Sequence, residues 1–278
     1  MSVFPYTQVD VFTERPLRGN PLGVVHRADA LSEAQMQNLA RWTNLSETTF
    51  PLQPGSPEAD YKVRIFTPGG ELPFAGHPTL GSCHAWLAHG GAPMVPGRVV
   101  QQCGVGLVPI RLEGKRAAFA APPLRTEPVE PAMLSQVCAA LGLQPASVRA
   151  SLWLDNGPRW LGLLLDDAAS VLALEPDHVA LKGLAKVGVV GPHPAGGECQ
   201  FEVRAFAAPI GIVEDPVTGS LNASLAQWLI GEGRAPERYV AAQGTRLGRM
   251  GRVHIEREGD TMWVGGSCVT CIRGEVEI

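Results

Sequence analysis

Three titratable side chains, Glu47, His77 and Asp215, stand at positions where the sequence favours acid–base chemistry. His77 and Asp215 belong to a motif that the chain carries twice, Gly76-His-Pro-Thr-Leu-Gly-Ser82 and, 138 residues later, Glu214-Asp-Pro-Val-Thr-Gly-Ser220. Two related turns that differ at a titratable residue predict an asymmetric active site between two similar halves of the chain.

Glu47 precedes an apolar segment, Thr48 to Pro51, that is predicted to be a strand. A carboxylate that enters a buried segment has its charged form disfavoured. Its pKa should therefore rise toward the range that is useful for general acid–base catalysis. The spacing alone favours a surface glutamate at the end of a strand, so both interpretations stay open at this point.

Each motif is predicted to lead into a helix, whose first backbone N–H groups have no partner within the helix. Together with the helix dipole, such an N-terminus favours carboxylates and other anions. The hydroxyls of Thr218 and Ser220 add donors, and Gly76 and Gly219 let a ligand approach the backbone. We therefore expect a small carboxylate substrate. The alternative is that glycine and proline only shape the starts of two buried helices.

The elements that must position these residues occur in the same order in both halves. A strand precedes each motif, at Tyr61 to Phe66 and at Phe201 to Phe206, and an amphipathic helix follows it. These helices are predicted to end at Gly90 and near Gly231, because glycine is a common C-terminal stop. Each half therefore suggests a curved sheet with one long helix against it. This is an α+β pattern without the strand–helix alternation of a parallel sheet.

Further elements follow from periodicity and capping signals. Ser32 and Gln35 form a capping-box pattern, so a helix is predicted to begin there. A second helix is predicted from Ala132 to Leu141, and alternating strands from Tyr239 onward. The remaining predicted strands are Val9 to Phe12, Leu22 to Val25, Thr48 to Pro51, Arg98 to Gln102, Leu107 to Leu112, Arg116 to Ala120, Ser151 to Leu154, Trp160 to Leu165 and Lys186 to Val190.

A proline-rich stretch from Pro122 to Pro131 is predicted to link two domains. Its four prolines oppose a continuous helix or strand ladder. The predicted N-terminal domain spans residues 1–122 and the C-terminal domain residues 131–267. A return of the last strand, near 268–278, to the N-terminal domain is left open.

Composition argues against several classes of function. The 278 residues are 45% hydrophobic and 18% charged, as expected for a globular protein of about two domains. A net charge of −4 and scattered basic residues argue against nucleic acid binding. No run of about 18 apolar residues predicts a membrane span. The strand-like N-terminus lacks a signal-peptide pattern, so we expect a cytoplasmic protein.

Cofactor and metal motifs are missing from the sequence. It contains neither a GxGxxG nor a Walker-type loop, so we expect no nucleotide cofactor. The six cysteines are expected to be free thiols, and the pair Cys268 and Cys271 lacks the second CxxC that a zinc ribbon needs. A Ser-His-Asp hydrolase is disfavoured because no Gly-x-Ser-x-Gly elbow surrounds Ser82 or Ser220.

Several motifs, taken together and in this order, resemble the phenazine-biosynthesis PhzF-like family over essentially the whole chain. They are Gly19-Asn-Pro-Leu-Gly23, Asn44-Leu-Ser-Glu-Thr-Thr-Phe50, Arg64-Ile-Phe, Glu71-Leu-Pro-Phe-Ala-Gly-His77, Glu214 to Ser220, Gln243-Gly244 and Gly248-Arg249. The resemblance implies a diaminopimelate-epimerase-like fold, in which two similar domains each form a barrel-like, mostly antiparallel sheet around a central helix. It also implies an active site between the domains and a homodimer.

The same resemblance implies proton transfer without a cofactor. The family's namesake isomerises trans-2,3-dihydro-3-hydroxyanthranilate by moving a proton from ring carbon 3 to carbon 1. The matching residues here make Glu47 the proton carrier, His77 and Asp215 its assistants, and Gly76 and Ser220 part of the substrate site. Related racemases use two thiols, but no cysteine stands at the matching turns.

The substrate is not decided by the sequence. We expect an isomerase of dihydro-hydroxyanthranilate or a similar small cyclic amino acid. The alternatives are an isomerase or epimerase of another small amino or hydroxy acid, and a non-catalytic small-ligand-binding homologue.

Overall fold

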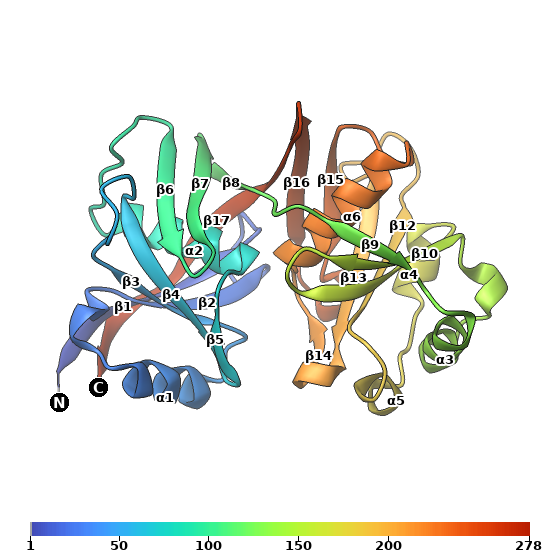
Figure 1. Ribbon diagram of the computed structural model, residues 1–278, viewed down its shortest axis with the longest axis horizontal. Helices are drawn as coiled ribbons and strands as arrows, with labels where there is room; N and C mark the ends of the chain where they lie inside the picture. Colours follow the sequence, from blue (N-terminus) through green and yellow to red (C-terminus); the bar gives the residue numbers. More distant parts are fainter. Residues whose placement is uncertain (1) are drawn as a thin grey trace. The chain divides into compact units, whose positions relative to one another are not determined.

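The computed structural model describes residues 2–278 and divides the chain into two compact units (Figure 1). Unit 1 comprises Met1–Ala120 together with Gly265–Ile278, and unit 2 comprises Ala121–Val264. Unit 1 is thus built from both ends of the chain, whereas unit 2 is one continuous segment. None of the helices within residues 2–278 has the length and hydrophobicity that crossing a membrane requires.

Eight strands of unit 1 form a closed ring. Its neighbours pair in the order β1, β2, β3, β4, β6, β7, β8, β17 and back to β1, and only β2–β3 and β4–β6 are parallel. A short strand, β5, forms a hairpin with β4. The bounds are β1 (Val3–Val11), β2 (Asn20–Val25), β3 (Thr48–Leu52), β4 (Tyr61–Thr67), β5 (Gly70–Leu72), β6 (Arg98–Cys103), β7 (Gly106–Glu113), β8 (Arg116–Ala120) and β17 (Thr261–Glu277).

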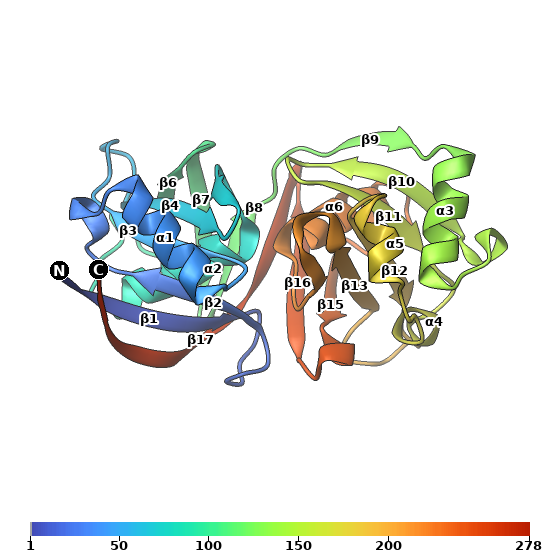
Figure 2. The ribbon, with the colours of Figure 1, turned by 90° about the horizontal axis from the view of Figure 1, so that it is seen from below.

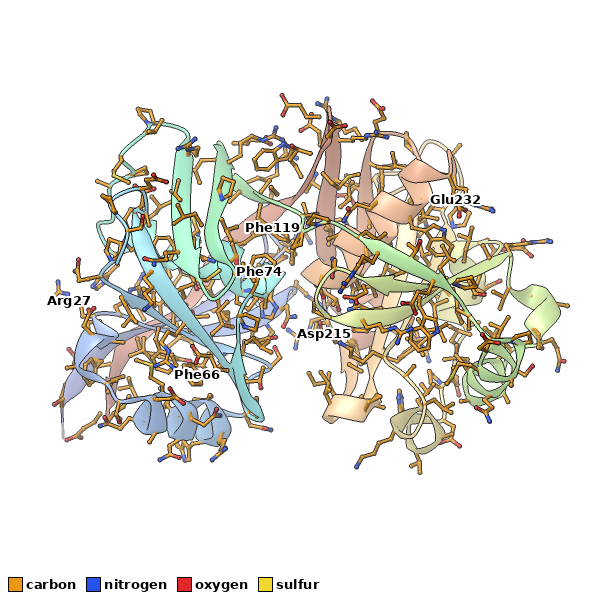
Figure 3. The ribbon with its side chains drawn as sticks, in the orientation of Figure 1. Arg27, Phe66, Phe74, Phe119, Asp215 and Glu232 are labelled. Carbon is orange, nitrogen blue, oxygen red and sulfur yellow. The ribbon has the colours of Figure 1, made fainter. Side chains whose placement is uncertain are left out.

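One helix, α2 (Gly76–Ala88), fills this barrel. Nine of its 13 residues are buried, and it contacts β1, β2, β3, β6 and β8, which lie around the ring. Burial on all sides is typical of a helix that lies in a hydrophobic core. Gly81 permits close packing, since a Cβ there would lie 2.5 Å from a methyl group of Leu22. The edge-to-face rings of Phe74 and Phe119, 5.5 Å apart, pack beside the helix start (Figure 3).

The second helix of unit 1, α1 (Glu33–Thr43), packs on β3 and β4. Its predicted capping box is confirmed, because Ser32 and Gln35 exchange both hydrogen bonds. Its buried Met36, Leu39 and Ala40 join a core cluster with Phe50 and Phe66. This amphipathic packing fixes where the chain leaves the helix, just before Glu47.

Unit 2 repeats this plan. Its strands pair in the order β9, β10, β11, β12, β13, β15, β16, and β14 forms a hairpin with β13. After β16 the chain turns at residues 259–260 into the start of β17, where the carbonyl of Met262 accepts from the amide of Ala121. The bounds are β9 (Arg125–Pro128), β10 (Ala150–Asp155), β11 (Arg159–Leu164), β12 (Val187–Pro192), β13 (Phe201–Ala207), β14 (Ile212–Asp215), β15 (Arg238–Gln243) and β16 (Gly251–Glu258).

The central helix of unit 2 is α6 (Gly219–Gly231), of which ten residues are buried. Three further helices, α3 (Pro131–Leu141), α4 (Ala168–Leu172) and α5 (His178–Lys182), contribute to a separate apolar cluster with β11 and β12. Short 3₁₀ helices occupy Ala28–Ala30, Pro145–Ser147, Ala208–Ile210 and Thr245–Leu247. The predicted fold class, α+β with a barrel-like sheet around a helix, is confirmed.

The proline-rich stretch differs from its prediction as a plain linker. Four of its residues, Arg125–Pro128, form β9 and pair with β10, and α3 begins at Pro131. Proline is compatible with the end of this exposed strand and with the first position of a helix, where no N–H is needed. The stretch belongs to unit 2.

The structure confirms the internal repeat. The number of positions between equivalent residues of the two units, however, differs from the spacing of the two sequence motifs. The parallel pairs Tyr61–Gln101 and Phe201–Ala241 are equivalent at a shift of 140 positions, not 138. In both units an arginine two residues before a phenylalanine binds a glutamate of the following hairpin strand, Arg64 with Glu71 and Arg204 with Glu214. His77 and Asp215 are therefore not equivalent positions, which corrects the interpretation of the two turns as matched.

Both ends of the chain meet in unit 1, where β1 and β17 lie side by side (Figure 2). Ser2 and Ile278 exchange two backbone hydrogen bonds, of 2.8 and 2.9 Å. Strand β17 begins in unit 2 and continues into unit 1 from Gly265 onward. The last strand thus closes the barrel that the first strand opens.

Candidate active site

Glu47 lies in the short connection between α1 and β3. The helix ends at Asn44 in the left-handed conformation (φ 53°), which turns the chain back toward the barrel. The side chain of Glu47 is only 15% exposed. Burial raises its pKa to about 7, and the neighbouring Ser46 acts in the opposite direction. A carboxyl group with this pKa can accept and return a proton near neutral pH.

His77 is the second residue of α2 and is 5% exposed at its side chain. Its Nε2 lies 3.4 Å from Oε2 of Glu47, so the two groups that the sequence singled out in this half are in contact. The contact lacks hydrogen-bond geometry. Catalytic hydrogen bonds are often long in a ligand-free site and tighten when substrate binds.

Asn20 approaches the other side of the His77 ring. Its Nδ2 lies 3.5 Å from Nδ1 of His77. Asn20 is the first residue of β2, and the turn before it is held by Asp10, whose Oδ2 accepts from the amides of Arg18 and Gly19 at 2.7 and 2.9 Å. No role was predicted for Asn20, which the sequence shows only as part of a Gly-Asn-Pro motif.

The start of α2 differs from the expected turn. The helix begins at Gly76, so Pro78 lies within its first turn and supplies no N–H. The amide of Thr79 already donates to the carbonyl of Ala75. The first turn of α2 therefore offers fewer backbone N–H donors than a helix start with its proline ahead of the helix.

In unit 2, Asp215 ends β14 and leads into α6 (Figure 3). Its Oδ2 accepts from the hydroxyl of Thr218 at 2.6 Å, and its carbonyl accepts from Nε2 of Gln243 at 3.0 Å. Gln243 also accepts from the amide of Thr218 and from Asn222, both at 3.0 Å or less. This network fixes Asp215 and the helix start as one rigid group.

Gly219 and Ser220 lie in the first turn of α6, so the predicted helix start is present, and anion binding there stays a prediction. The hydroxyl of Ser220 lies 3.4 Å from the indole nitrogen of Trp160, and its carbonyl accepts from the amide of Asn156 at 3.0 Å. Since an indole nitrogen only donates, this contact does not use the hydrogen of the Ser220 hydroxyl.

The structure thus groups the predicted residues in two sets. Unit 1 holds Glu47 beside His77, with Gly76 adjacent, and unit 2 holds Asp215, Thr218, Gly219 and Ser220 around one helix start. No role was predicted for the supporting residues Asn20, Gln243 and Asn222. Asn20 and Gln243 lie 57 and 25 positions from His77 and Thr218, which they contact, so their contacts gave no local signal.

The thiol and serine alternatives are not supported by the side-chain environments. Ser82 is fully buried inside the barrel and donates to Thr49 at 2.8 Å. Burial raises the pKa of the Cys83 thiol to about 12, which keeps it protonated and inert. All six cysteines are free, and among residues 2–278 no three histidine, cysteine or acidic side chains gather in a group able to hold a metal ion.

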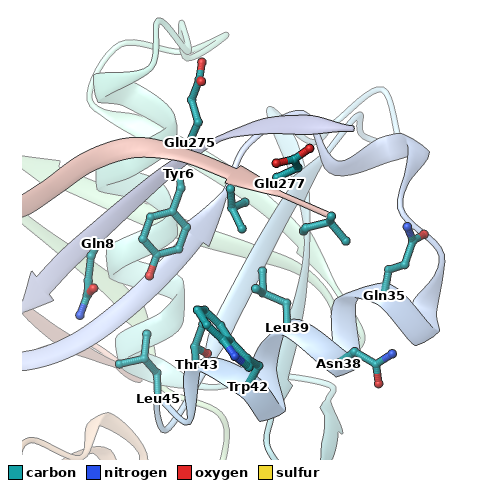
Figure 4. Close-up of a pocket in the computed structure, with 12 residues that line it drawn as sticks. Tyr6, Gln8, Gln35, Asn38, Leu39, Trp42, Thr43, Leu45, Glu275 and Glu277 are labelled. Carbon is teal, nitrogen blue, oxygen red and sulfur yellow. The ribbon is translucent and has the colours of Figure 1, made fainter. Parts of the chain in front are cut away.

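A surface hollow of about 810 Å³ lies elsewhere in unit 1, beside α1 and the paired strands β1 and β17 (Figure 4). Tyr6 and Gln8 line one side of it, and Leu39, Trp42 and Leu45 line the other. Neither Glu47 nor His77 lines this hollow, so we do not assign the candidate chemistry to it.

Comparison with known proteins gives consistent matches over the whole chain. The model of a family described as phenazine biosynthesis-like protein (PhzC-PhzF) matches residues 9–274. Trans-2,3-dihydro-3-hydroxyanthranilate isomerase of Pseudomonas aeruginosa is 35% identical, with 91% of this chain and 90% of that protein covered. Antisense-enhancing sequence 1 of Schizosaccharomyces pombe is also 35% identical, with 99% of both chains covered.

A solved structure shows the same fold. The PhzF-family phenazine biosynthesis protein of Bacillus anthracis aligns with a TM-score of 0.88 over 100% of both chains, at 22% sequence identity. At this sequence identity, the structural similarity shows a shared fold.

Proposed function

Because the chain is an isomerase of the phenazine biosynthesis-like family, as its motifs predicted, we propose that it moves a proton between two carbons of a small cyclic amino carboxylate. The proposed substrate is trans-2,3-dihydro-3-hydroxyanthranilate or a close analogue, by analogy with the P. aeruginosa relative. The observation that carries the proposal is the buried Glu47 carboxyl, with a pKa raised to about 7, in contact with His77.

Glu47 is the proposed acid–base residue. Its carboxylate removes the proton from ring carbon 3, and the resulting carboxylic acid returns a proton to carbon 1. One C–H bond breaks and one forms, so substrate and product have the same composition and oxidation state. A raised pKa suits both halves of this step, because the group must accept and release a proton with similar ease.

His77 is proposed to donate a hydrogen bond to the Glu47 carboxylate and to hold it in place. Its position in the first turn of α2 places it next to the amide of Gly76. Gly76 and the helix dipole are proposed to bind an anionic group of the substrate.

The residues that the sequence singled out in unit 2 are proposed to bind polar groups of a substrate. Asp215, held by Thr218 and Gln243, is an acceptor for an amino or hydroxyl group. Thr218, Gly219 and Ser220 supply the helix start and hydroxyl donors for a carboxylate. The network around Gln243 supports this proposal, because preorganised groups need no rearrangement when substrate binds.

The test is proton NMR in D₂O with purified protein and trans-2,3-dihydro-3-hydroxyanthranilate. Wild type is expected to consume the substrate with loss of the signal of the ring C3 proton. Glu47→Gln keeps the shape of the side chain but cannot carry a proton, so turnover should fall by at least about 10²-fold. Binding of substrate by this variant should stay within about tenfold of wild type.

Glu58→Gln serves as the matched control, since Glu58 is an exposed glutamate of the same unit and should be replaceable without loss. Unchanged turnover in Glu47→Gln would refute the assignment of Glu47. Absence of reaction with wild type would remove this substrate and direct the search to other small carboxylates.

A further inference from the structure

The two ring nitrogens of His77 face chemically different partners. Nδ1 lies 3.5 Å from the amide nitrogen of Asn20, and Nε2 lies 3.4 Å from a carboxylate oxygen of Glu47. In a neutral imidazole one nitrogen carries the proton and the other is an acceptor. The partner of one nitrogen therefore decides what the other can do.

The amide of Asn20 decides this choice. An amide nitrogen can only donate, so Nδ1 of His77 must be the unprotonated nitrogen. The ring proton then resides on Nε2 and faces Glu47. The reversed amide would require a proton on Nδ1, and the lone pair of Nε2 would then oppose the oxygen of an ionised Glu47. An ionised Glu47 and the Asn20 orientation thus favour the same tautomer.

Asn20 is itself rigidly placed. It is 1% exposed, and it pairs with Val11 of the neighbouring strand. Asp10, 2% exposed, accepts from the two amides that precede Asn20. The Gly19 backbone packs closely against β1, because a Cβ there would lie 2.2 Å from the carbonyl oxygen of Val11. A side chain anchored in this way can hold one orientation against the ring.

We infer that Asn20 is a positioning residue that fixes the Nε2–H tautomer of His77, so that His77 donates to Glu47 and never accepts its proton. One carboxyl oxygen of Glu47 is then occupied as an acceptor, and the proton moved during catalysis resides on the other oxygen, Oε1. The catalytic role given to Asn20 rests on the proposed function. The assignment of the His77 tautomer does not depend on that function.

The test is ¹⁵N NMR of ligand-free protein labelled at histidine, at a pH of about 8, above the ordinary pKa of imidazole. The His77 signals are assigned by their loss in His77→Gln. In wild type, Nδ1 should show the shift of an unprotonated, pyridine-type nitrogen and Nε2 that of a protonated, pyrrole-type nitrogen. A protonated Nδ1 in wild type would overturn the inference, with no variant needed.

Asn20→Asp is the informative variant. A carboxylate can only accept, so the ring proton should move to Nδ1 or both nitrogens should become protonated. Asn20→Ala, which lacks any donor, should give a mixture of both tautomers and serves if the aspartate variant does not fold. A His77 pattern that is identical to wild type in a folded Asn20 variant would also overturn the inference.

Two controls separate this effect from general disturbance. His26 of the same unit, whose Nε2 lies 2.9 Å from the hydroxyl of Thr7, should keep its signals in every Asn20 variant. Asn38→Asp adds the same charge on the exposed face of α1 and should leave His77 unchanged. A shift of the His77 signals in Asn38→Asp as large as in Asn20→Asp would show a charge effect and overturn the inference.

Activity provides an independent reading. If the isomerase proposal holds, Asn20→Asp should lower kcat by about 10²-fold or more, since a histidine in the wrong tautomer loses its role. Failure of wild type to turn over the substrate would refute the proposed reaction and leave the NMR result standing. The two failures are therefore distinguishable.

Discussion

Glu47 experiences two opposing influences at the scale of one residue. Burial disfavours its charge and raises its pKa to about 7, as the apolar segment after it predicted, while Ser46 stabilises the charged form. The sequence was sufficient to select Glu47 and His77. It marked Asn20 only as part of a motif and gave no sign of its contact with His77, because 57 positions separate the two residues and only the folded barrel brings them together.

A second histidine makes stability depend on pH. His26 is 3% exposed, and burial, the charge of the stacked His89 ring and Arg27 together lower its pKa to about 4. Between the ordinary value of about 6.5 and about 4, the unfolded chain binds a proton that the folded chain does not. Stability should therefore fall as pH falls through this range, by up to about 3 kcal/mol from this residue.

Urea unfolding at several pH values between 7.5 and 4, for wild type and His26→Gln, measures this contribution. The comparison with the variant is needed because Glu47, with its raised pKa, acts in the opposite direction and makes folding more favourable as pH falls below about 7. As the pH falls from about 6.5 to 4, the free energy of unfolding of wild type should decrease relative to that of His26→Gln. Equal slopes would contradict the prediction.

At the scale of elements, the two central helices and the capping box at Ser32 followed from periodicity and from known cap residues. The exact helix starts did not. The sequence shows proline in both turns, but Pro78 lies inside the first turn of α2 whereas Pro216 precedes α6 by three residues. Proline is tolerated in a first helical turn and before it, so its presence alone does not locate the start.

Gly81 tests the packing of α2 inside its barrel. Alanine is a better helix former by about 1 kcal/mol. A Cβ at Gly81, however, would lie 2.5 Å from Leu22 and 2.9 Å from Val11. Overpacking of this kind typically costs about 1–3 kcal/mol, so after the gain in helix propensity Gly81→Ala should destabilise the protein by up to about 2 kcal/mol. Equilibrium urea unfolding measures the change.

Gly231, in the last turn of α6, is the matched position. A Cβ there meets no atom within 4 Å, so Gly231→Ala should be neutral or slightly stabilising. A loss of stability at Gly231 equal to that at Gly81 would show that backbone conformation, and not close packing, governs both positions.

At the scale of the whole molecule, the repeated motif and the repeated strand order predicted two similar halves. Whether the last strand returns to the N-terminal domain was left open in the prediction. An alternating pattern indicates a strand but does not show which strands it pairs with. The strand β9 was missed, since proline-rich segments rarely form ladders. Its pairing with β10 depends on a neighbour that lies outside the segment itself.

The closure by β17 predicts how fragments behave. Residues 1–120 alone lack this strand, which leaves the edges of β1 and β8 unpaired and prone to association. We expect this fragment to aggregate, as followed by circular dichroism and light scattering. Joining residues 265–278 to residue 120 through a short flexible linker should restore a soluble, folded unit. An equally well-folded fragment 1–120 would contradict the role of β17.

The shared last strand also sets an order for folding during synthesis. Ribosomes deliver a chain from its N-terminus, and the leading domain commonly folds first. Here the first residues must wait, since their barrel closes only when β17, ending at Glu277, has emerged. The continuous segment Ala121–Val264 becomes available earlier as a complete unit. The nascent chain therefore completes its second half before its first.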